Sequence, residues 1–288
     1  MAKVVVDIRA KLGEGPCWDE RDRVLWWVDI VGQTLHRHDP RTGANSAFNI
    51  GAAVAAVAPR SCGGLVLALR DGFYGFDPAT EALELIVEVE PNQATHRIND
   101  SKCDRAGRLW GGTMADNESP GAGSFYCFDP RAGLSRIWSN ITCSNGIGWS
   151  PDDRRMYYID SGSRRVDVCD YDALTGEVTN RTPFVQLSTQ SVEPDGLTVD
   201  SDGCVWVALW GGGAVHRYGP DGSLDRVVEL PALNITNCTF GGDDLKTLYI
   251  TSASIQTTPE QSAIYPLSGA VFAITPGVQG LPTNEFAG

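Results

Sequence analysis

Three oxygen-bearing side chains stand at the same point of a repeated sequence pattern, and a glycine follows each of them. They are Glu14, Asn145 and Asp195. Two carboxylates and one amide oxygen are hard donors that suit a divalent cation, with water or a bound molecule completing its coordination. No histidine or cysteine holds this position, which excludes a closed zinc site of thiolates and imidazoles. Calcium, magnesium, manganese, iron(II) and zinc all stay open as the single divalent cation.

The dipeptides Asn-Gly and Asp-Gly are also common hairpin turns, and either one alone would be read as a turn. Glycine accounts for 32 of the 288 residues, so three glycines in phase are hard to ascribe to chance. Because glycine has no side chain, the backbone at these positions can approach a bound ion closely, and a structural role for the glycines is the other interpretation.

A further polar pair, Arg97 and Asn99, lies two positions apart. On an extended segment both side chains project to one side, where they can hold the hydroxyl or carbonyl oxygens of a polar substrate. A surface arginine beside a turn asparagine is an equally good interpretation of this pair alone. Asp100 would point the other way. The glycine-rich segment 117–123 that follows is long enough to overhang a site, either as a lid or as an irregular loop.

The elements that position these residues are short strands in a repeat. The first residue of one apolar strand in each unit falls at intervals of 40 to 49 residues, at Leu25, Leu65, Leu109, Met156, Val205 and Leu248. Clusters of Gly, Pro and Asp separate runs of β-branched and aromatic residues, as in strand-turn-strand sequences. No amphipathic helix stands out. Six units of about 40–45 residues with four strands each are typical of a six-bladed β-propeller, an all-β fold.

The two ends of the chain indicate how the ring closes. The residues after the apolar run 270–274 make a poor strand because they contain Pro276, Gly277, Gly280 and Pro282. The apolar segment 4–8 precedes the first unit and can supply the missing outer strand of the last blade, which removes an exposed sheet edge. We therefore expect residues 1–288 to form a single propeller domain closed by its N-terminal strand.

Composition excludes several classes of function. The net charge of −13 opposes binding to nucleic acid or to anionic membranes. The N-terminal residues lack the features of a signal peptide, and no apolar run reaches the roughly 20 residues of a membrane span, so a cytoplasmic monomer is expected. The eight cysteines are scattered, which favours reduced thiols over disulfides. No Gly-x-Ser-x-Gly, Walker or dinucleotide-binding motif occurs, and the tryptophans are expected in the core.

Several of these segments together resemble the senescence-marker-protein, gluconolactonase and regucalcin-like family of six-bladed propellers. The similarity spans essentially the whole chain and is carried by these motifs: Leu12–Pro16, Arg97–Asp100, Gly112–Met114, Ser144–Gly146, Pro194–Gly196 and Pro266–Phe272. Bacterial lactonases acting on pentonolactones and hexonolactones are similar as well. The resemblance implies one divalent metal held by Glu14, Asn145 and Asp195, substrate contacts from Arg97 and Asn99, and hydrolysis of a sugar lactone to the sugar acid.

The sequence departs from the family pattern at two places. Ser101 stands where many members have glycine, and Asp116-Asn117-Glu118 follows Ala115 where animal members have two adjacent glutamates. Asp116 is our candidate for the carboxylate that the family places on a substrate hydroxyl. In the mechanism that we expect, the metal polarises the lactone carbonyl and Asp195 serves as general base for the attacking water.

Two other functions fit the same residues. A cation in a propeller channel can serve hydrolysis of another ester or of a phosphotriester, and it can also be purely structural in a binding or scaffold propeller. The fold alone does not choose among them. A scaffold would have no use for Arg97 and Asn99 beside the ion.

Overall fold

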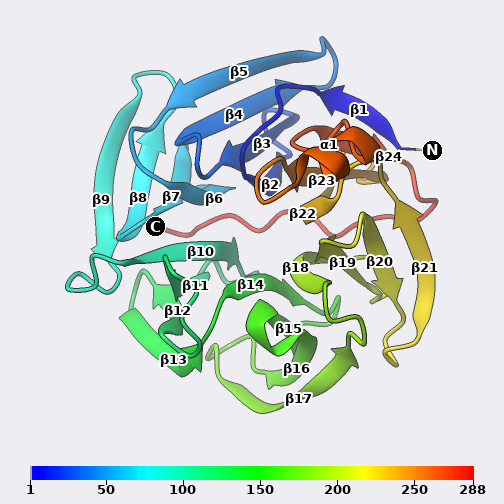
Figure 1. The fold of residues 1–288 in the computed structure, drawn as a ribbon. Helices are drawn as coiled ribbons and strands as arrows, with labels where there is room; N and C mark the ends of the chain where they lie inside the picture. Colours follow the sequence, from blue (N-terminus) through cyan, green and yellow to red (C-terminus); the bar gives the residue numbers. More distant parts are fainter. Residues whose placement is uncertain (1) are drawn as a thin grey trace.

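Six four-stranded antiparallel sheets stand in one ring around a central channel, in a computed structural model that describes residues 2–288 (Figure 1). The first strand of each blade is innermost, and each of these inner strands contacts the inner strands of both neighbouring blades. The predicted six-bladed β-propeller is confirmed. The channel is therefore lined by the six segments that carry the candidate site residues.

Blades 1 to 3 follow one another in chain order. Their strands, from inner to outer, are β2 (Gly13–Asp19), β3 (Val24–Asp29), β4 (Thr34–Asp39) and β5 (Ala44–Asn49); β6 (Val54–Pro59), β7 (Leu65–Leu69), β8 (Gly72–Asp77) and β9 (Ala82–Glu88); and β10 (His96–Cys103), β11 (Leu109–Ala115), β12 (Gly123–Asp129) and β13 (Gly133–Ile141).

Blades 4 to 6 complete the ring. Their strands are β14 (Ser144–Trp149), β15 (Arg155–Asp160), β16 (Arg165–Tyr171) and β17 (Val178–Gln186); β18 (Glu193–Val199), β19 (Val205–Trp210), β20 (Ala214–Tyr218) and β21 (Leu224–Glu229); and β22 (Asn234–Gly241), β23 (Thr247–Ala253) and β24 (Val271–Ile274), with β1 (Lys3–Val6) at the outer edge.

The N-terminal strand closes the ring as expected. In β1, Lys3 lies opposite Ala273 and Val4 lies opposite Phe272 of β24, in an antiparallel pair. The first and last parts of the chain thus share one sheet, so the sixth blade has the same number of strands as the others.

Two short helical segments interrupt the strands. They are the 3₁₀ turn η1 (Ser161–Ser163) after β15 and the helix α1 (Pro259–Ile264) before β24. The helix begins with a capping box between Thr258 and Gln261, and it buries none of its residues. A helix without a buried face has no apolar periodicity, which explains why the sequence pattern did not indicate it.

An aspartate and a tryptophan tie the inner strand to the second strand in alternate blades. The indole nitrogens of Trp26, Trp110 and Trp206 donate to Asp19, Asp104 and Asp200 at 3.3, 2.8 and 2.9 Å. All three tryptophans are buried, as expected for core residues. A buried indole N–H needs a partner, and the carboxylate provides one.

The last residues form a strap, defined here as residues 275–288, which crosses the ring at one mouth of the channel (Figure 1). The backbone of Gln279 accepts from Ser201, and Phe286 exchanges backbone hydrogen bonds with Pro59 and Ser61. The Phe286 side chain is fully buried in the largest core cluster. The strap therefore links blade 5 to blade 2 across the channel.

All eight cysteines are free thiols in the structure. Within residues 2–288, no helix combines the length and the apolar character that a membrane span needs.

Candidate metal centre and active site

A cavity of about 380 Å³ opens where the inner strands begin. Five of the six predicted site residues line it: Glu14, Arg97, Asn99, Asn145 and Asp195. They come from β2, β10, β14 and β18, so the fold brings together residues that are up to 181 positions apart in the chain.

A break in strand pairing occurs at the predicted ligand positions. The register between inner and second strand shifts between Glu14 and Cys17, between Asn145 and Ile147, and between Pro194 and Leu197. The other three inner strands have the same irregularity. A bulge turns the local backbone and re-aims a side chain. The bulges explain how a side chain of a paired strand comes to point into the channel.

The glycines after the three candidate ligands make room for the next blade. A Cβ on Gly146 would lie 2.8 Å from the Asp195 carbonyl oxygen, and one on Gly196 would lie 2.0 Å from Cγ of Asn237. Gly15 has a φ of +50° and faces the Ala55 carbonyl. These glycines therefore permit close packing of the inner strands around the axis, which is the structural role that the sequence left open.

Glu14 is buried, and one of its oxygens is already engaged. Its Oε2 accepts from the Gly15 backbone at 2.8 Å and from Asn237 Nδ2 at 3.1 Å. Asn237 Nδ2 also lies 3.5 Å from Asp100 Oδ2. Burial, and next the charge of Asp100, raise the pKa of Glu14 to about 8, and burial raises the pKa of Asp100 to about 6.

Asp195 is 6% exposed, and burial and neighbouring charges, without any hydrogen bond from residues 2–288, act on its carboxylate. Burial, followed by the charges of Glu14 and Asp100, holds the pKa of Asp195 well above its ordinary value. Carboxylates buried near one another repel, and a cation between them removes the repulsion. The residues present therefore fit a hard divalent cation.

The Asn145 amide oxygen would have to be the third donor. Among residues 2–288, no three His, Cys, Asp or Glu side chains gather in the manner of a metal cluster. A cation at this point would depend on two carboxylates and one neutral amide, a weakly charged set that leaves room for substrate or water.

Arg97 and Asn99 lie beside this set, as expected. Arg97 Nη1 donates to Asn99 Oδ1 at 2.6 Å, and Asn99 Nδ2 donates to Asn145 Oδ1 at 3.0 Å and to the Ser144 carbonyl at 2.8 Å. The remaining N–H groups of a guanidinium are free to bind oxygens in the cavity. The pair is thus part of the channel wall and is not a surface turn.

In two blades, the aspartate at the end of the second strand holds the backbone segment that precedes a candidate metal ligand. Asp29 accepts from the backbone N–H of Lys11 and Leu12, and Asp160 accepts from those of Thr142 and Cys143. The sequence shows these aspartates as the last residue of the repeated pattern, but the pattern gives no sign of their partners.

The expectation for Asp116 is not supported by its position. Its carboxylate forms an ion pair with Arg70, with oxygens 2.9 and 3.1 Å from the two guanidinium nitrogens, and Asp116 is absent from the described lining of the cavity. Glu118 and Glu193 line the cavity instead. Burial raises the pKa of Glu193, with the charge of Glu118 as the next cause. Sequence reasoning missed both. Glu118 lies in the loop after β11, whose course the repeat does not predict, whereas Glu193 begins β18 two positions before Asp195, a spacing on an extended segment that could have revealed it.

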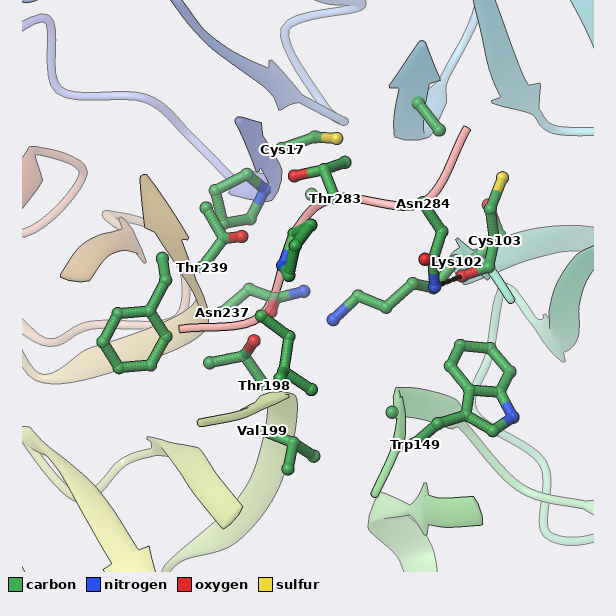
Figure 2. A pocket seen from close by; sticks show the side chains of 18 of the residues that line it. Cys17, Lys102, Cys103, Trp149, Thr198, Val199, Asn237, Thr239, Thr283 and Asn284 are labelled. Atoms are coloured by element: carbon green, nitrogen blue, oxygen red, sulfur yellow. Dashed lines mark hydrogen bonds between the residues drawn. The ribbon is translucent and has the colours of Figure 1, made fainter. Parts of the chain in front are cut away.

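A smaller cavity of about 100 Å³ lies at the opposite ends of the inner strands, beneath the strap. Figure 2 shows Thr283 and Asn284 of the strap beside it, and Lys102 reaching toward its middle, near Asn237. Lys102 Nζ donates to the Leu197 carbonyl at 2.8 Å, which joins blades 3 and 5. Asp100 and Asn237 line this cavity and also lie under Glu14, so they separate the two ends of the channel.

The sequence model of the SMP-30/gluconolactonase/LRE-like region matches residues 12–254, a range that contains Glu14, Arg97, Asn99, Asn145 and Asp195 of the 380 Å³ cavity. The chain belongs to this family. Its sequence is 37% identical over 288 residues to the Bacillus subtilis protein named "Putative sugar lactone lactonase YvrE", covering 100% of this chain and 99% of that protein.

Other members of the SMP-30/gluconolactonase/LRE-like family match as fully. Chicken regucalcin is 38% identical over 97% of this chain and 96% of its own length. A regucalcin from Agrobacterium tumefaciens, described as a calcium-binding protein, superimposes with a TM-score of 0.95 at 30% identity, over 99% of this chain and 97% of that one. The fold and the family resemblance are therefore established on both sequence and structure.

Proposed function

We propose that this protein hydrolyses an uncharged sugar lactone, a pentonolactone or a hexonolactone, to the sugar acid, and that it uses one divalent cation. One observation carries the proposal: two carboxylates and an amide from three separate blades line a single cavity beside an arginine and an asparagine. The family description and the name of the Bacillus relative point to the same chemistry.

Glu14, Asn145 and Asp195 would hold the cation, which supplies Lewis-acid polarisation of the lactone carbonyl when bound. Arg97 and Asn99 bind the ring hydroxyls and orient the ester toward the three donors. Asp195 accepts the proton of the attacking water, a role that suits a carboxyl group whose pKa is raised above its ordinary value by burial and by the charge of Glu14. Glu14 has one oxygen bound by Gly15 and Asn237, which leaves its other oxygen for the cation.

The charges around the cavity favour a neutral substrate. The described lining of the cavity contains four carboxylates and one guanidinium. The carboxylates belong to Glu14, Glu118, Glu193 and Asp195, and the guanidinium belongs to Arg97. The four carboxylates outweigh the combined charge of Arg97 and a divalent cation, so a lactone with a phosphate or carboxylate group would still meet net repulsion, whereas a neutral lactone meets none. Ring opening produces a carboxylate, so the same charges help to expel the product. The volume of about 380 Å³ lies in the usual range for a small-molecule site, about 300–1,000 Å³.

The test is a panel of lactones with protein that has been treated with chelator and then supplied with calcium, manganese, magnesium or zinc. Acid release is followed with a pH indicator, after subtraction of the spontaneous opening of each lactone. We expect cation-dependent turnover that the substitution Asp195→Ala abolishes. Asp243→Ala, which removes an exposed carboxylate paired with Arg23, is the matched control and is expected to keep full activity.

A second candidate is calcium binding without catalysis, which the description of the Agrobacterium relative favours. The same panel separates the two functions. Tight calcium binding with no lactone turnover by the wild-type protein would support the binding role and would rule out the lactonase.

A further inference from the structure

Ser161 is the first residue of the turn after β15, and it is 4% exposed. Its Oγ donates to the Pro194 carbonyl at 2.7 Å and accepts from Asn145 Nδ2 at 2.8 Å. It therefore joins a side chain of blade 4 to the backbone that immediately precedes Asp195 in blade 5.

The direction of this link is fixed. A hydroxyl has one hydrogen, and the Pro194 carbonyl can only accept, so Ser161 must receive its second hydrogen bond from a donor. The donor is the amide nitrogen of Asn145, and its Oδ1 is consequently turned away from Ser161, toward Asn99 and the cavity.

The far end of the chain of hydrogen bonds enforces the same direction. Arg97 can only donate, and its Nη1 donates to Asn99 Oδ1, so Asn99 presents its nitrogen to Asn145 Oδ1. Four hydrogen bonds thus run one way through blades 3, 4 and 5, from a group without acceptors to a group without donors: Arg97, Asn99, Asn145, Ser161 and Pro194.

We infer that Ser161 is a positioning residue of the cation site: it anchors the Asn145 amide in the orientation that turns Oδ1 toward the cation, and it ties that amide to the segment that carries Asp195. The inference rests on the proposed function, because it assumes that Asn145 Oδ1 is a cation donor. The Arg97–Asn99 end fixes the Asn145 oxygen toward the cavity, and Ser161 supplies the acceptor that holds the Asn145 nitrogen on the side of blade 5.

The variant that tests this is Ser161→Ala, with Ser163→Ala as matched control. Ser163 lies in the same turn, and its Oγ donates to the Asp160 carbonyl at 2.7 Å without contact to Asn145. Ser161→Thr restores the hydroxyl. Each protein is freed of metal with chelator, and its dissociation constants for Ca²⁺ and Mn²⁺ are measured by isothermal titration calorimetry, alongside the melting temperature in chelator and kcat and KM for the best lactone.

Loss of an outer partner of a metal ligand typically weakens metal affinity by about 10–100-fold, and we expect a loss in this range for Ser161→Ala. Ser163→Ala keeps the wild-type dissociation constant, and Ser161→Thr recovers most of the affinity. The KM of Ser161→Ala changes less than its metal affinity, because Arg97 keeps its contact with Asn99.

Three results overturn the inference. If Ser161→Ala binds both cations within twofold of the wild type, the positioning role fails while the proposed function stands. If Ser161→Ala and Ser163→Ala lose affinity and melting temperature alike, the turn is merely structural. If the wild-type protein binds neither cation, the inference and the metal-dependent function fail together.

Discussion

We expect Asp195 to destabilise the protein once the cation has been removed. The substitution Asp195→Asn should therefore stabilise the cation-free protein, and it should also stop catalysis. Asparagine keeps the shape of the side chain and carries no charge. The pKa of Asp195 is held well above the ordinary value of 3.8, first by burial and then by the charge of Glu14. A carboxyl group of this kind contributes its full stability below its ordinary pKa and loses it as the pH rises toward the raised value.

The size of the effect follows from the pH. Each pH unit above 3.8 lowers the free energy of unfolding by about 1.4 kcal/mol until the raised pKa is reached. The advantage of Asp195→Asn over the wild type should therefore grow as the pH rises from 5 to 7. For a protein of this size, each 1 kcal/mol corresponds to about 2–4 °C in melting temperature.

The assay is thermal unfolding in chelator at pH 5, 6 and 7, followed by circular dichroism. Asp200→Asn is the opposite control, since Asp200 is equally buried but is paired with Arg217 at 2.7 Å and with Trp206. Loss of one partner of a buried ion pair destabilises by about 3–5 kcal/mol. If Asp195→Asn also lowers the melting temperature, by an amount that does not change with pH, the reasoning about a repulsive buried cluster is refuted.

Three further predictions concern cation affinity, substrate charge and the strap. Burial raises the pKa of Glu14 to about 8, so protons compete with the cation below that pH. Calorimetry should therefore find calcium affinity falling by at least about tenfold per pH unit from pH 8 to pH 6, since Asp195 can bind a proton as well. An affinity that is flat over this range would be evidence against Glu14 as a ligand. Glu118→Gln with Glu193→Gln should raise kcat/KM for a phosphorylated lactone relative to a neutral one by about 2–10-fold at low salt, and added salt should shrink the gain; unchanged discrimination would remove these two carboxylates from substrate selection. Phe286→Ala should lower the free energy of unfolding by about 3–5 kcal/mol in a urea titration, because Phe286 is fully buried; a loss below about 1 kcal/mol would mean that the strap contributes little to the core.

The sequence predicts the propeller well because the packing requirement that produces the repeat is the same in every blade. Each blade must present apolar residues to its two neighbours, and this demand recurs at each unit, so Leu25 and its counterparts mark the period. Closure was also predictable, because an apolar segment before the first unit, observed as Lys3–Val6, has no other place to pair. The capped helix α1 was not predictable, since it buries nothing.

At the site, position in the repeat brought Glu14, Asn145 and Asp195 together, because residues in equal phase meet around the axis. Position within the repeat cannot reveal functional residues that lie in loops or turns. Ser161 follows a strand, and Glu118 lies in the loop after Ala115. Asp116 lies two positions before Glu118, and its ion pair with Arg70 holds it away from the cavity lining.

The central claim is that one divalent cation binds at the junction of three blades. The most direct measurement is a crystal structure of the protein soaked in manganese, with an anomalous difference map. The account predicts one strong peak in the 380 Å³ cavity, about 2.0–2.6 Å from oxygens of Glu14, Asn145 and Asp195. A peak elsewhere, or a cavity in which Asn145 Oδ1 still accepts only from Asn99 and no peak appears, would contradict it.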